Sequence, residues 1–346
     1  MKILHKKLIG WYTKNKRPLP WRQTSNPYKI WVSEIILQQT QIKTGIKYYE
    51  HFIKTFPNVK TLANCSELDI LKVWQGLGYY SRALNMLHSA KKIMLNYEGV
   101  FPSKYNDLIQ LKGIGDYTAA AISSICEDEK QAVVDGNVYR FLSRLYNIKT
   151  PINKASGQKL YKNIANKLMP NNNTGTYNQA IMEFGSIHCT KNNPKCQSCI
   201  FKKQCVSLKL DTIKLRPVKI KNIKKKTRYL NYLFLTQKNH FLVKQRGDND
   251  IWKKLYELPL IESKKLLKKE QLIANRYFKL LKKFKIKNPS LVNHKLSHQN
   301  LKILFWEIQS DNINNLGLKK ISIQDLEKYP FPTPLKNYID KALRNI

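Results

Sequence analysis

The sequence has few acidic residues and no long apolar run. Only 23 Asp and Glu accompany 62 Lys and Arg, which leaves a net charge of +39 over 346 residues. No apolar stretch approaches the ~18 residues that a membrane-spanning helix needs. Lysines interrupt the N-terminal "MKILHKKLIGWYTKNK" too early for a signal peptide. We therefore expect a cytoplasmic protein with no membrane partner, whose six cysteines do not form a disulfide framework.

The positive charge favours a polyanionic partner. Each phosphate that a lysine or arginine neutralises releases condensed counterions, so a net charge of +39 suits nucleic acid binding. Arginine is scarce, however: it supplies only 10 of the 62 basic residues, and lysine is abundant along the whole chain. Part of the charge therefore reflects general composition.

The pattern of apolar residues divides the chain into two parts. Over residues 1–207, apolar residues recur three or four apart in segments such as "SRALNMLHSAKKIMLNY", which predicts helices. Residues 208–228 lose this periodicity and are rich in Lys and Arg, so we interpret them as a basic linker. Over residues 229–346, alternating aromatic-rich segments predict strands, with one long Lys-rich helix at about 263–285. An all-α domain followed by an α+β domain is expected.

Four cysteines, Cys189, Cys196, Cys199 and Cys205, follow the spacing C-x6-C-x2-C-x5-C. Four thiolates this close in sequence can surround one metal centre, and both tetrahedral zinc and a [4Fe-4S] cluster take four cysteines. Zinc sites usually pair two short C-x-x-C knuckles across a longer gap, whereas this loop is continuous and contains only one. The spacing therefore favours a [4Fe-4S] cluster over zinc.

The stretch "GIGDYT" at 113–118 contains two glycines but lacks the third glycine of a dinucleotide-binding fingerprint, and the segment before it is helical. A helix-hairpin-helix fits better. Gly113 and Gly115 allow a sharp turn and present backbone N–H groups at the start of the next helix, where the helix dipole favours a phosphate. A purely structural turn is the alternative, although a second such turn, "GLGYYSR" at 76–82, argues against it.

Two carboxylates have contrasting sequence environments. Asp135 precedes "GNVYRFLSRL" at an N-cap position, where the helix N-terminus favours the ionised form. Glu34 lies within "WVSEIIL", whose apolar neighbours predict partial burial and a raised pKa. A simple helix cap and a solvated surface glutamate are the alternatives. One carboxyl that holds a proton and one that stays charged are suited to separate roles as general acid and as electrostatic stabiliser.

The order of these motifs resembles the helix-hairpin-helix DNA glycosylase superfamily. With "WVSEIILQQTQI", "GLGYYSRA" and "YNQAIMEFGSIHC" included, residues 10–205 are closely similar to the adenine DNA glycosylase family. The resemblance implies a monofunctional enzyme of base excision repair that removes adenine mispaired with 8-oxoguanine or guanine in double-stranded DNA. It also implies a [4Fe-4S] cofactor. We expect a monomer that is associated with the nucleoid through its DNA.

The resemblance implies roles for individual residues. Glu34 is expected to act as general acid and base, and Asp135 to stabilise the oxocarbenium ion or trap it covalently, beside Tyr117 and Asn137. Other matching positions are expected to contact the mispair or the DNA backbone: Arg22, Gln39, Tyr79, Gly113, Gly115, Gln179, Ser297 and His298. Among these, Gln39 and Tyr79 fill or wedge the duplex, and Arg22 and Gln179 hold the flipped adenine.

The C-terminal part, with "DIWKKLYELPL" and "YPFPTPLKNYIDKAL", resembles the Nudix-like domain of the same family. The Nudix catalytic box, G-x5-E-x7-R-E-x2-E-E-x-G, is absent, so pyrophosphate hydrolysis is not expected. The stretch "HKLSHQNLKI" resembles the loop that reads 8-oxoguanine, with Ser297 and His298 as candidates for the purine edge. Leu296 stands where family members commonly have phenylalanine, which argues against an intercalating role at that position.

Two rival functions are less favoured. The bifunctional endonuclease III class shares the hairpin, the aspartate and the cluster but also cuts the DNA strand, for which it needs a lysine at the position of Tyr117. Tyrosine has no amine with which to form a Schiff base. A non-enzymatic iron-sulfur DNA-binding protein would have no need of Glu34 and Asp135 in a phosphate-lined cleft.

Overall fold

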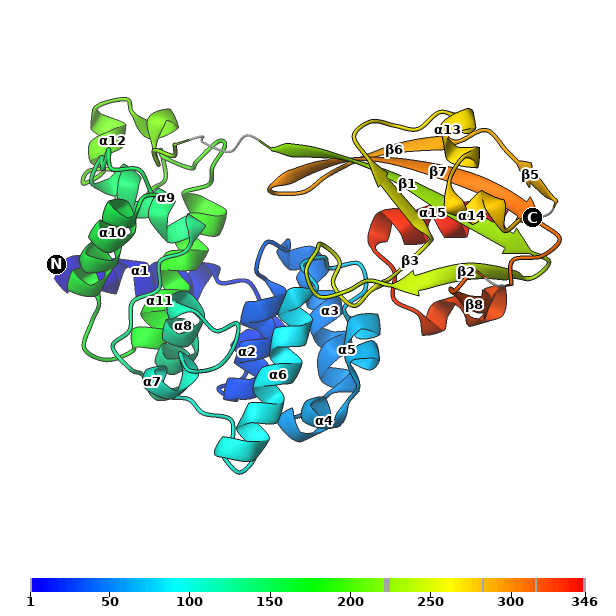
Figure 1. Ribbon diagram of the computed structural model, residues 1–346. Coiled ribbons are helices and arrows are strands. Elements are labelled where there is room, and N and C mark those ends of the chain that lie inside the picture. The colour runs from blue at the N-terminus through cyan, green and yellow to red at the C-terminus, as the bar shows by residue number, and fades with distance from the viewer. Residues whose placement is uncertain (1, 221–224, 282, 315, 345–346) are drawn as a thin grey trace. The chain divides into compact units, whose positions relative to one another are not determined.

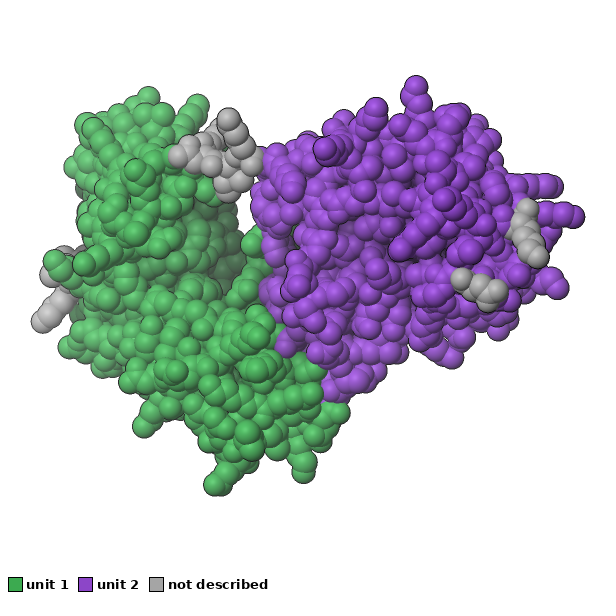
Figure 2. Space-filling model, viewed as in Figure 1, with its two compact units in different colours: residues 1–64, 85–221 green, residues 65–84, 222–346 purple. Residues whose placement is uncertain are grey.

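The computed structural model describes residues 2–220, 225–281, 283–314 and 316–344 (Figure 1). Contacts group the chain into two units, one of Met1–Asn64 with Asn85–Lys221 and one of Cys65–Leu84 with Asn222–Ile346 (Figure 2). Within the described ranges, no helix has the length and apolar character needed to span a membrane.

The first unit is built from helices. They are α1 (Lys2–Asn15), α2 (Pro27–Ile36), α3 (Ile42–Thr55), α4 (Val59–Asn64), α6 (Ser81–Asn96), α7 (Tyr105–Leu108), α8 (Asp116–Glu127), α9 (Gly136–Leu145), α10 (Ala155–Leu168), α11 (Thr174–Glu183) and α12 (Val206–Lys209). Helix α6 begins in the second unit. Two 3-10 turns, η1 (Pro20–Arg22) and η3 (Ile213–Leu215), and a π-helical turn, η2 (Phe184–His188), complete the unit.

The predicted hairpin is present between α7 and α8. Gly113 has φ of +85°, a left-handed conformation that favours glycine, and a Cβ there would lie 2.9 Å from Asn85 Cβ. Gly115 is the N-cap of α8 in an extended conformation, so the turn itself requires only the first of the two glycines. Ala119, Ala120 and Ala121 are completely buried on α8, which packs on α2 and α11.

The second unit is built around a sheet. In the described residues the sheet has eight strands, β1 (Lys226–Gln237), β2 (His240–Gln245), β3 (Tyr256–Glu257), β4 (Leu260–Ser263), β5 (Phe284–Ile286), β6 (Ser290–Lys295), β7 (Gln299–Ser310) and β8 (Lys319–Ser322). Its helices are α5 (Glu67–Val73), α13 (Lys269–Ile273), α14 (Arg276–Lys279), η4 (Ile323–Lys328) and α15 (Thr333–Leu343). Strands β1 and β7 pair in parallel at the centre, and the other pairs are antiparallel.

Both faces of this sheet are covered, because alternate side chains of a strand point to opposite faces. Tyr232 of β1 and Phe305 of β7 belong to one core with Ile339 of α15, whereas Leu233 of β1 belongs to another core with Phe278 of α14. A strand buried on both faces reads as a nearly continuous apolar run, as "YLNYLFL" does.

The long helix predicted at about 263–285 is wrong. Ser263 belongs to β4, and the helical part is divided into α13 and α14 at Asn275, whose Oδ1 accepts a hydrogen bond from Tyr277 N at 3.3 Å. Upstream, Asn231 Oδ1 of β1 accepts from Leu267 N at 3.2 Å and ties the chain to the sheet. Asparagine side chains compete with the helix for backbone hydrogen bonds, and here one holds the chain before α13 begins and the other divides the helical part at Asn275. Residue 282 lies outside the described residues.

The segment predicted as a basic linker, 208–228, lies partly in regular structure. Helix α12 reaches Lys209, η3 follows, and β1 begins at Lys226. Asn153 exchanges two hydrogen bonds with the backbone of Ile220, at 2.8 and 3.0 Å, so the segment packs on the first unit as far as that residue. Residues 221–224 of the predicted linker lie outside the described residues.

Candidate active site

Glu34 is a buried carboxyl on α2. The helix is started by Pro27 and by Asn26, whose side chain accepts from Lys29 N, and its apolar residues bury most of the helix surface. Glu34 is 8% exposed, and this burial raises its pKa to about 7, aided by the negative charge of Asp135 and opposed by hydrogen bonding with Tyr117. The burial and raised pKa predicted for Glu34 are confirmed.

Asp135 is the N-cap of α9, as predicted. One carboxylate oxygen accepts from Asn137 N at 2.9 Å and Val138 N at 2.8 Å, and the other accepts from Asn137 Nδ2 at 2.6 Å. Burial raises the pKa of Asp135, and these hydrogen bonds and the Arg140 charge only partly offset that effect. The upward direction differs from the sequence expectation, because the depth of the carboxyl was not visible in the sequence.

Tyr117 stands beside both carboxyls in the first turn of α8. Its hydroxyl lies 3.2 Å from Met182 Sδ and is also close enough to Glu34 for hydrogen bonding to affect both pKa values. Burial and the charges of Glu34 and Asp135 raise the pKa of Tyr117 well above its ordinary value. The hydroxyl is therefore a neutral donor within the cavity at physiological pH.

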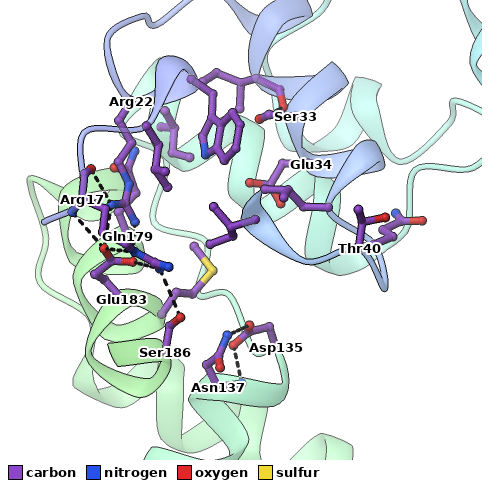
Figure 3. A pocket seen from close by; sticks show the side chains of 18 of the residues that line it. Arg17, Arg22, Ser33, Glu34, Thr40, Asp135, Asn137, Gln179, Glu183 and Ser186 are labelled. Carbon is purple, nitrogen blue, oxygen red and sulfur yellow. Dashed lines mark hydrogen bonds and ion pairs between the residues drawn. The ribbon is translucent and has the colours of Figure 1, made fainter. Parts of the chain in front are cut away.

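A cavity of about 450 Å³ brings these groups together. Figure 3 shows Glu34 and Asp135 on one side of it, and Arg17, Arg22, Gln179 and Glu183 on the other. The residues that line it include Arg17, Trp21, Arg22, Ser33, Glu34, Gln39, Tyr117, Asp135, Asn137, Gln179, Met182, Glu183 and Ser186. Every predicted catalytic residue lies on this cavity, as do Arg22, Gln39 and Gln179.

The cavity wall opposite Glu34 and Asp135 contains two arginines and one glutamate. Glu183 is 1% exposed and accepts hydrogen bonds from Arg17 N, Nε and Nη2 and from Arg22 Nη1 and Nη2, at 2.5–3.0 Å. Burial alone would raise the pKa of Glu183, but these bonds outweigh it and lower the pKa to about 2. Glu183 is thus a fixed anion that holds two cations at the cavity.

Gln179 is oriented by its own partner in this wall. Tyr12 OH donates to Gln179 Oε1 at 2.5 Å, and the Arg22 guanidinium lies over the Tyr12 ring, 5.3 Å from its centre. Because the amide oxygen is engaged, the amide N–H groups of Gln179 are the ones left to face the cavity.

Sequence reasoning missed several of these residues, including Tyr12, Arg17, Met182 and Glu183. Gln179 and Glu183 are four residues apart on α11, so helical periodicity would have placed Glu183 on the same face as a predicted site residue. No sequence signal connects Arg17 with Glu183, since 166 positions separate them.

A chain of hydrogen bonds runs from Asp135 to the cysteine loop. Asn137 Oδ1 accepts from Arg140 Nη2 at 2.8 Å, and Arg140 Nε donates to the carbonyl of Cys189 at 2.8 Å. Arg140 also donates to the carbonyl of Gly185 in the π-helical turn. A Cβ on Gly185 would lie 2.6 Å from the Asn137 carbonyl, so only glycine permits this approach of η2 to the start of α9.

Comparison with known proteins identifies the family. A family model described as "HhH-GPD superfamily base excision DNA repair protein" matches residues 32–166, and a NUDIX domain model matches residues 231–341. The chain is 39% identical to an adenine DNA glycosylase of Buchnera aphidicola subsp. Baizongia pistaciae, over 98% of this chain and 96% of that protein. The chain belongs to the adenine DNA glycosylase family.

A second relative agrees with this membership, and a solved structure agrees with the glycosylase fold of the first part of the chain. An adenine DNA glycosylase of Buchnera aphidicola subsp. Acyrthosiphon pisum is 33% identical over 99% of both chains. A solved structure of a thermostable thymine-DNA glycosylase is 26% identical, with a TM-score of 0.56, and covers 60% of this chain and 96% of that chain. The resemblance found in the sequence is confirmed, as are the glycosylase domain and the Nudix-like domain with its sheet.

In this member of the adenine DNA glycosylase family, the four predicted ligands line one small cavity of about 30 Å³. Among the described residues, no group of three or more His, Cys, Asp or Glu side chains forms a preassembled metal site. N–H groups nevertheless point at two sulfurs, from Phe201 N to Cys199 and from Arg144 Nη1 to Cys189, both at 3.4 Å. Four cysteines, two of them with N–H donors to their sulfurs, are a donor set that fits an iron-sulfur cluster.

The hairpin of this family member carries a charged group beside its glycines. Asp116, the first residue of α8, accepts from Tyr105 OH at 2.8 Å and from Lys162 Nζ at 3.0 and 3.1 Å. Lys162 also donates to the Ala132 carbonyl at 2.8 Å. The backbone N–H groups after Gly113 and Gly115 therefore lie next to an ion pair at the start of the helix.

The remaining predicted residues of this family member lie in its second unit. Tyr79, Ser297 and His298 line one cavity of about 590 Å³. Ser297 and His298 occupy the turn between β6 and β7, where Ser297 Oγ and His298 Nδ1 are 3.2 Å apart. Leu296 N donates to the Gln299 carbonyl at 2.8 Å and closes this turn.

Proposed function

We propose that the protein is a monofunctional DNA glycosylase that removes adenine mispaired with 8-oxoguanine or guanine in duplex DNA. The observation that carries the proposal is the pairing of Glu34, whose pKa is about 7, with the helix-capping Asp135 on one cavity. A carboxyl with this pKa is half protonated near neutral pH, so it can both give and take a proton.

The reaction begins when Glu34 donates its proton to N7 of the flipped adenine. Protonation makes the base a better leaving group, and the bond between C1′ and N9 breaks with its electron pair going to the base. The sugar becomes an oxocarbenium ion, which Asp135 stabilises electrostatically or by a transient bond to C1′. Glu34, now ionised, takes a proton from water, whose oxygen adds to C1′. An abasic site and free adenine result, and Glu34 is protonated again.

Asn137 and Tyr117 support this chemistry. Asn137 Nδ2 donates to one carboxylate oxygen of Asp135 at 2.6 Å, and the backbone N–H groups of Asn137 and Val138 hold the other, so the carboxylate is fixed in orientation on the cavity. Tyr117 contributes a neutral hydroxyl beside Glu34. Because Tyr117 has no amine, the sugar cannot be captured as a Schiff base, and the strand stays intact.

Arg22 and Gln179 are the groups proposed to hold the flipped adenine. Every bond described for Glu183 is to Arg17 or Arg22, so Glu183 acts on the base through the arginines it orients. The Gln179 amide N–H groups, left free by the bond from Tyr12, suit acceptor nitrogens of a purine ring. Hydrogen-bond donors on this wall would therefore pair with the acceptor nitrogens of the adenine ring.

Contacts with the rest of the duplex are proposed at four places. Gln39, at φ of +60° on the turn after α2, and Tyr79 fill or wedge the stack beside the target base. Gly113 and Gly115 present backbone N–H groups to a phosphate. In the second unit, Ser297 and His298 read the edge of 8-oxoguanine.

The four cysteines are proposed to hold a [4Fe-4S] cluster. Cys189, Cys196, Cys199 and Cys205 would supply the thiolates, and the cluster would cross-link the loop between them. Arg140 joins the Cys189 carbonyl to Asn137, so an ordered loop supports the orientation of Asp135.

A substrate panel tests the proposed function. The wild-type protein is incubated with A:8-oxoguanine, A:G and A:C duplexes and with a thymine-glycol duplex, with and without alkali. We expect strand breaks only at adenine and only after alkali, because the glycosylase leaves an alkali-labile abasic site. Breakage at thymine glycol without alkali would contradict the proposal and favour the endonuclease III type of activity.

A further inference from the structure

The loop between α5 and α6 contains three residues whose backbone φ angles are positive. Gly76 and Gly78 have φ of +95° and +72°, and Tyr79, a non-glycine residue, has φ of +48°. A left-handed conformation costs an L-residue with a side chain about 1–2 kcal/mol. Such a conformation persists only where the surroundings impose it. Tyr79 nevertheless keeps 46% of its surface exposed, so burial of its ring does not supply the constraint.

Arg82 supplies contacts that hold this loop. Its guanidinium lies 5.7 Å from the centre of the Tyr79 ring and 5.1 Å from that of Trp74, a completely buried ring at the end of α5. Arg82 Nη2 donates to the Gly78 carbonyl at 3.1 Å and more weakly to the Leu77 carbonyl at 3.4 Å. The Arg82 side chain itself is 9% exposed.

Two further bonds complete the support. Trp74 Nε1 donates to the same Gly78 carbonyl at 3.1 Å, and Tyr80 OH accepts from Gly76 N at 3.3 Å. Arg82 N donates to the Tyr79 carbonyl at 2.9 Å, which starts α6 directly after the tyrosine. The backbone on both sides of Tyr79 is thus fixed, while its ring remains exposed.

We propose that Arg82 is a positioning residue that holds Tyr79 as a rigid wedge for opening the DNA stack. The proposal rests on the proposed function, in which Tyr79 enters the duplex. An aromatic ring can separate stacked bases only if the backbone that carries the ring is held in place. Arg82 ties the exposed Tyr79 ring to the buried Trp74 ring through one planar cation.

An arginine suits this position better than a lysine. The guanidinium is planar, so it can contact two aromatic rings while its N–H groups reach backbone carbonyls. Burial lowers the pKa of Arg82 to about 10, which still leaves it charged at neutral pH. A lysine would keep the charge but would lose the flat surface and the forked donors.

The test is a double-mutant cycle in the full-length protein. R82Q, Y79A and the Y79A/R82Q double variant are compared with wild type in single-turnover adenine release from an A:G duplex. R82Q is expected to slow release about tenfold, equivalent to about 1.4 kcal/mol. In the Y79A background the same substitution is expected to change the rate less than about twofold, since the element that Arg82 positions is already missing.

A second readout follows base opening directly. 2-Aminopurine replaces the target adenine, and its fluorescence rises when it leaves the stack. We expect a smaller rise with R82Q than with wild type, and no difference between Y79A and Y79A/R82Q. R82K, which keeps the charge and the aliphatic stem, should lie between R82Q and wild type, and it keeps the proposal testable if R82Q does not fold.

R276Q is the matched control. Arg276 also lies over a tyrosine in the second unit, 5.4 Å from the centre of the Tyr277 ring, but not in this loop. It should release adenine at the wild-type rate. Equal slowing by R82Q with and without Tyr79, or no slowing in either background, would overturn the proposal. If Y79A alone matched wild type, the wedge role would fall as well. Failure of wild type to release adenine would overturn the proposed function itself.

Discussion

Replacing Glu34 by glutamine should abolish activity and at the same time stabilise the protein at alkaline pH. Glu34 is 8% exposed and its pKa is about 7, whereas the ordinary value for glutamate is 4.5. Between these two values the folded protein keeps the proton that the unfolded chain releases. The free energy of unfolding therefore falls as pH rises from 4.5 to 7, and above 7 the loss is complete.

The size of the effect follows from the pKa difference. The ionised Glu34 destabilises the folded state by up to about 3 kcal/mol at pH 8 and by less than about 1 kcal/mol at pH 5. Glutamine is nearly isosteric with the protonated acid and does not ionise. E34Q should therefore exceed wild type in unfolding free energy by about 2–3 kcal/mol at pH 8, and by much less at pH 5. For a domain of this size that gain corresponds to a rise in Tm of about 5–10 °C.

The assay is thermal and urea unfolding of both proteins at pH 5, 6.5 and 8, followed by circular dichroism. E50Q serves as the control, because Glu50 lies exposed on α3 outside the cavity, and it should not gain stability selectively at pH 8. A stability difference between E34Q and wild type that is the same at all three pH values would contradict a raised pKa of Glu34. So would a loss of stability at pH 8.

Three further predictions concern the surroundings of the site. R140L breaks the link between Asn137 and the cysteine loop, so it should slow single-turnover adenine release about tenfold or more. R144L also removes bonds to that loop but none to Asn137, and it should slow release less. Equal effects of the two variants would count against the link. C199A should lower the iron content and visible absorbance of the purified protein, and a colourless wild-type protein that contains zinc would contradict the cluster. D116N should bind duplex DNA about twofold to fivefold more tightly at low salt, because a carboxylate beside the proposed phosphate contact is removed; unchanged or weaker binding would count against that contact.

The parts of the site that could be predicted from sequence are those set by local pattern. The burial of Glu34 follows from its apolar neighbours in one helix, and the capping bonds of Asp135 follow from its place before "GNVYRFLSRL". The helix-hairpin-helix turn is local in the same way, and Gly113 adopts the conformation that the turn requires. Such features depend on residues within a few positions of one another.

The parts that could not be predicted depend on distant contacts. Glu183 is a buried anion only because Arg17 and Arg22, which lie far from it in the sequence, form ion pairs with it in the fold. The upward pKa shift of Asp135 likewise depends on how deep α9 lies in the fold. The single helix predicted at 263–285 failed because the bond from Leu267 N to Asn231 joins the segment to a strand that periodicity cannot reveal.

The proposed activity releases adenine and leaves the DNA strand intact. The most direct measurement is a single-turnover reaction of wild type with an A:8-oxoguanine duplex, with the free base identified by chromatography and the strand examined on a denaturing gel without alkali. We expect one free adenine for each alkali-labile site, with the strand uncut until alkali is added. Strand cleavage that keeps pace with base release in the absence of alkali, or a failure to release adenine, would contradict it.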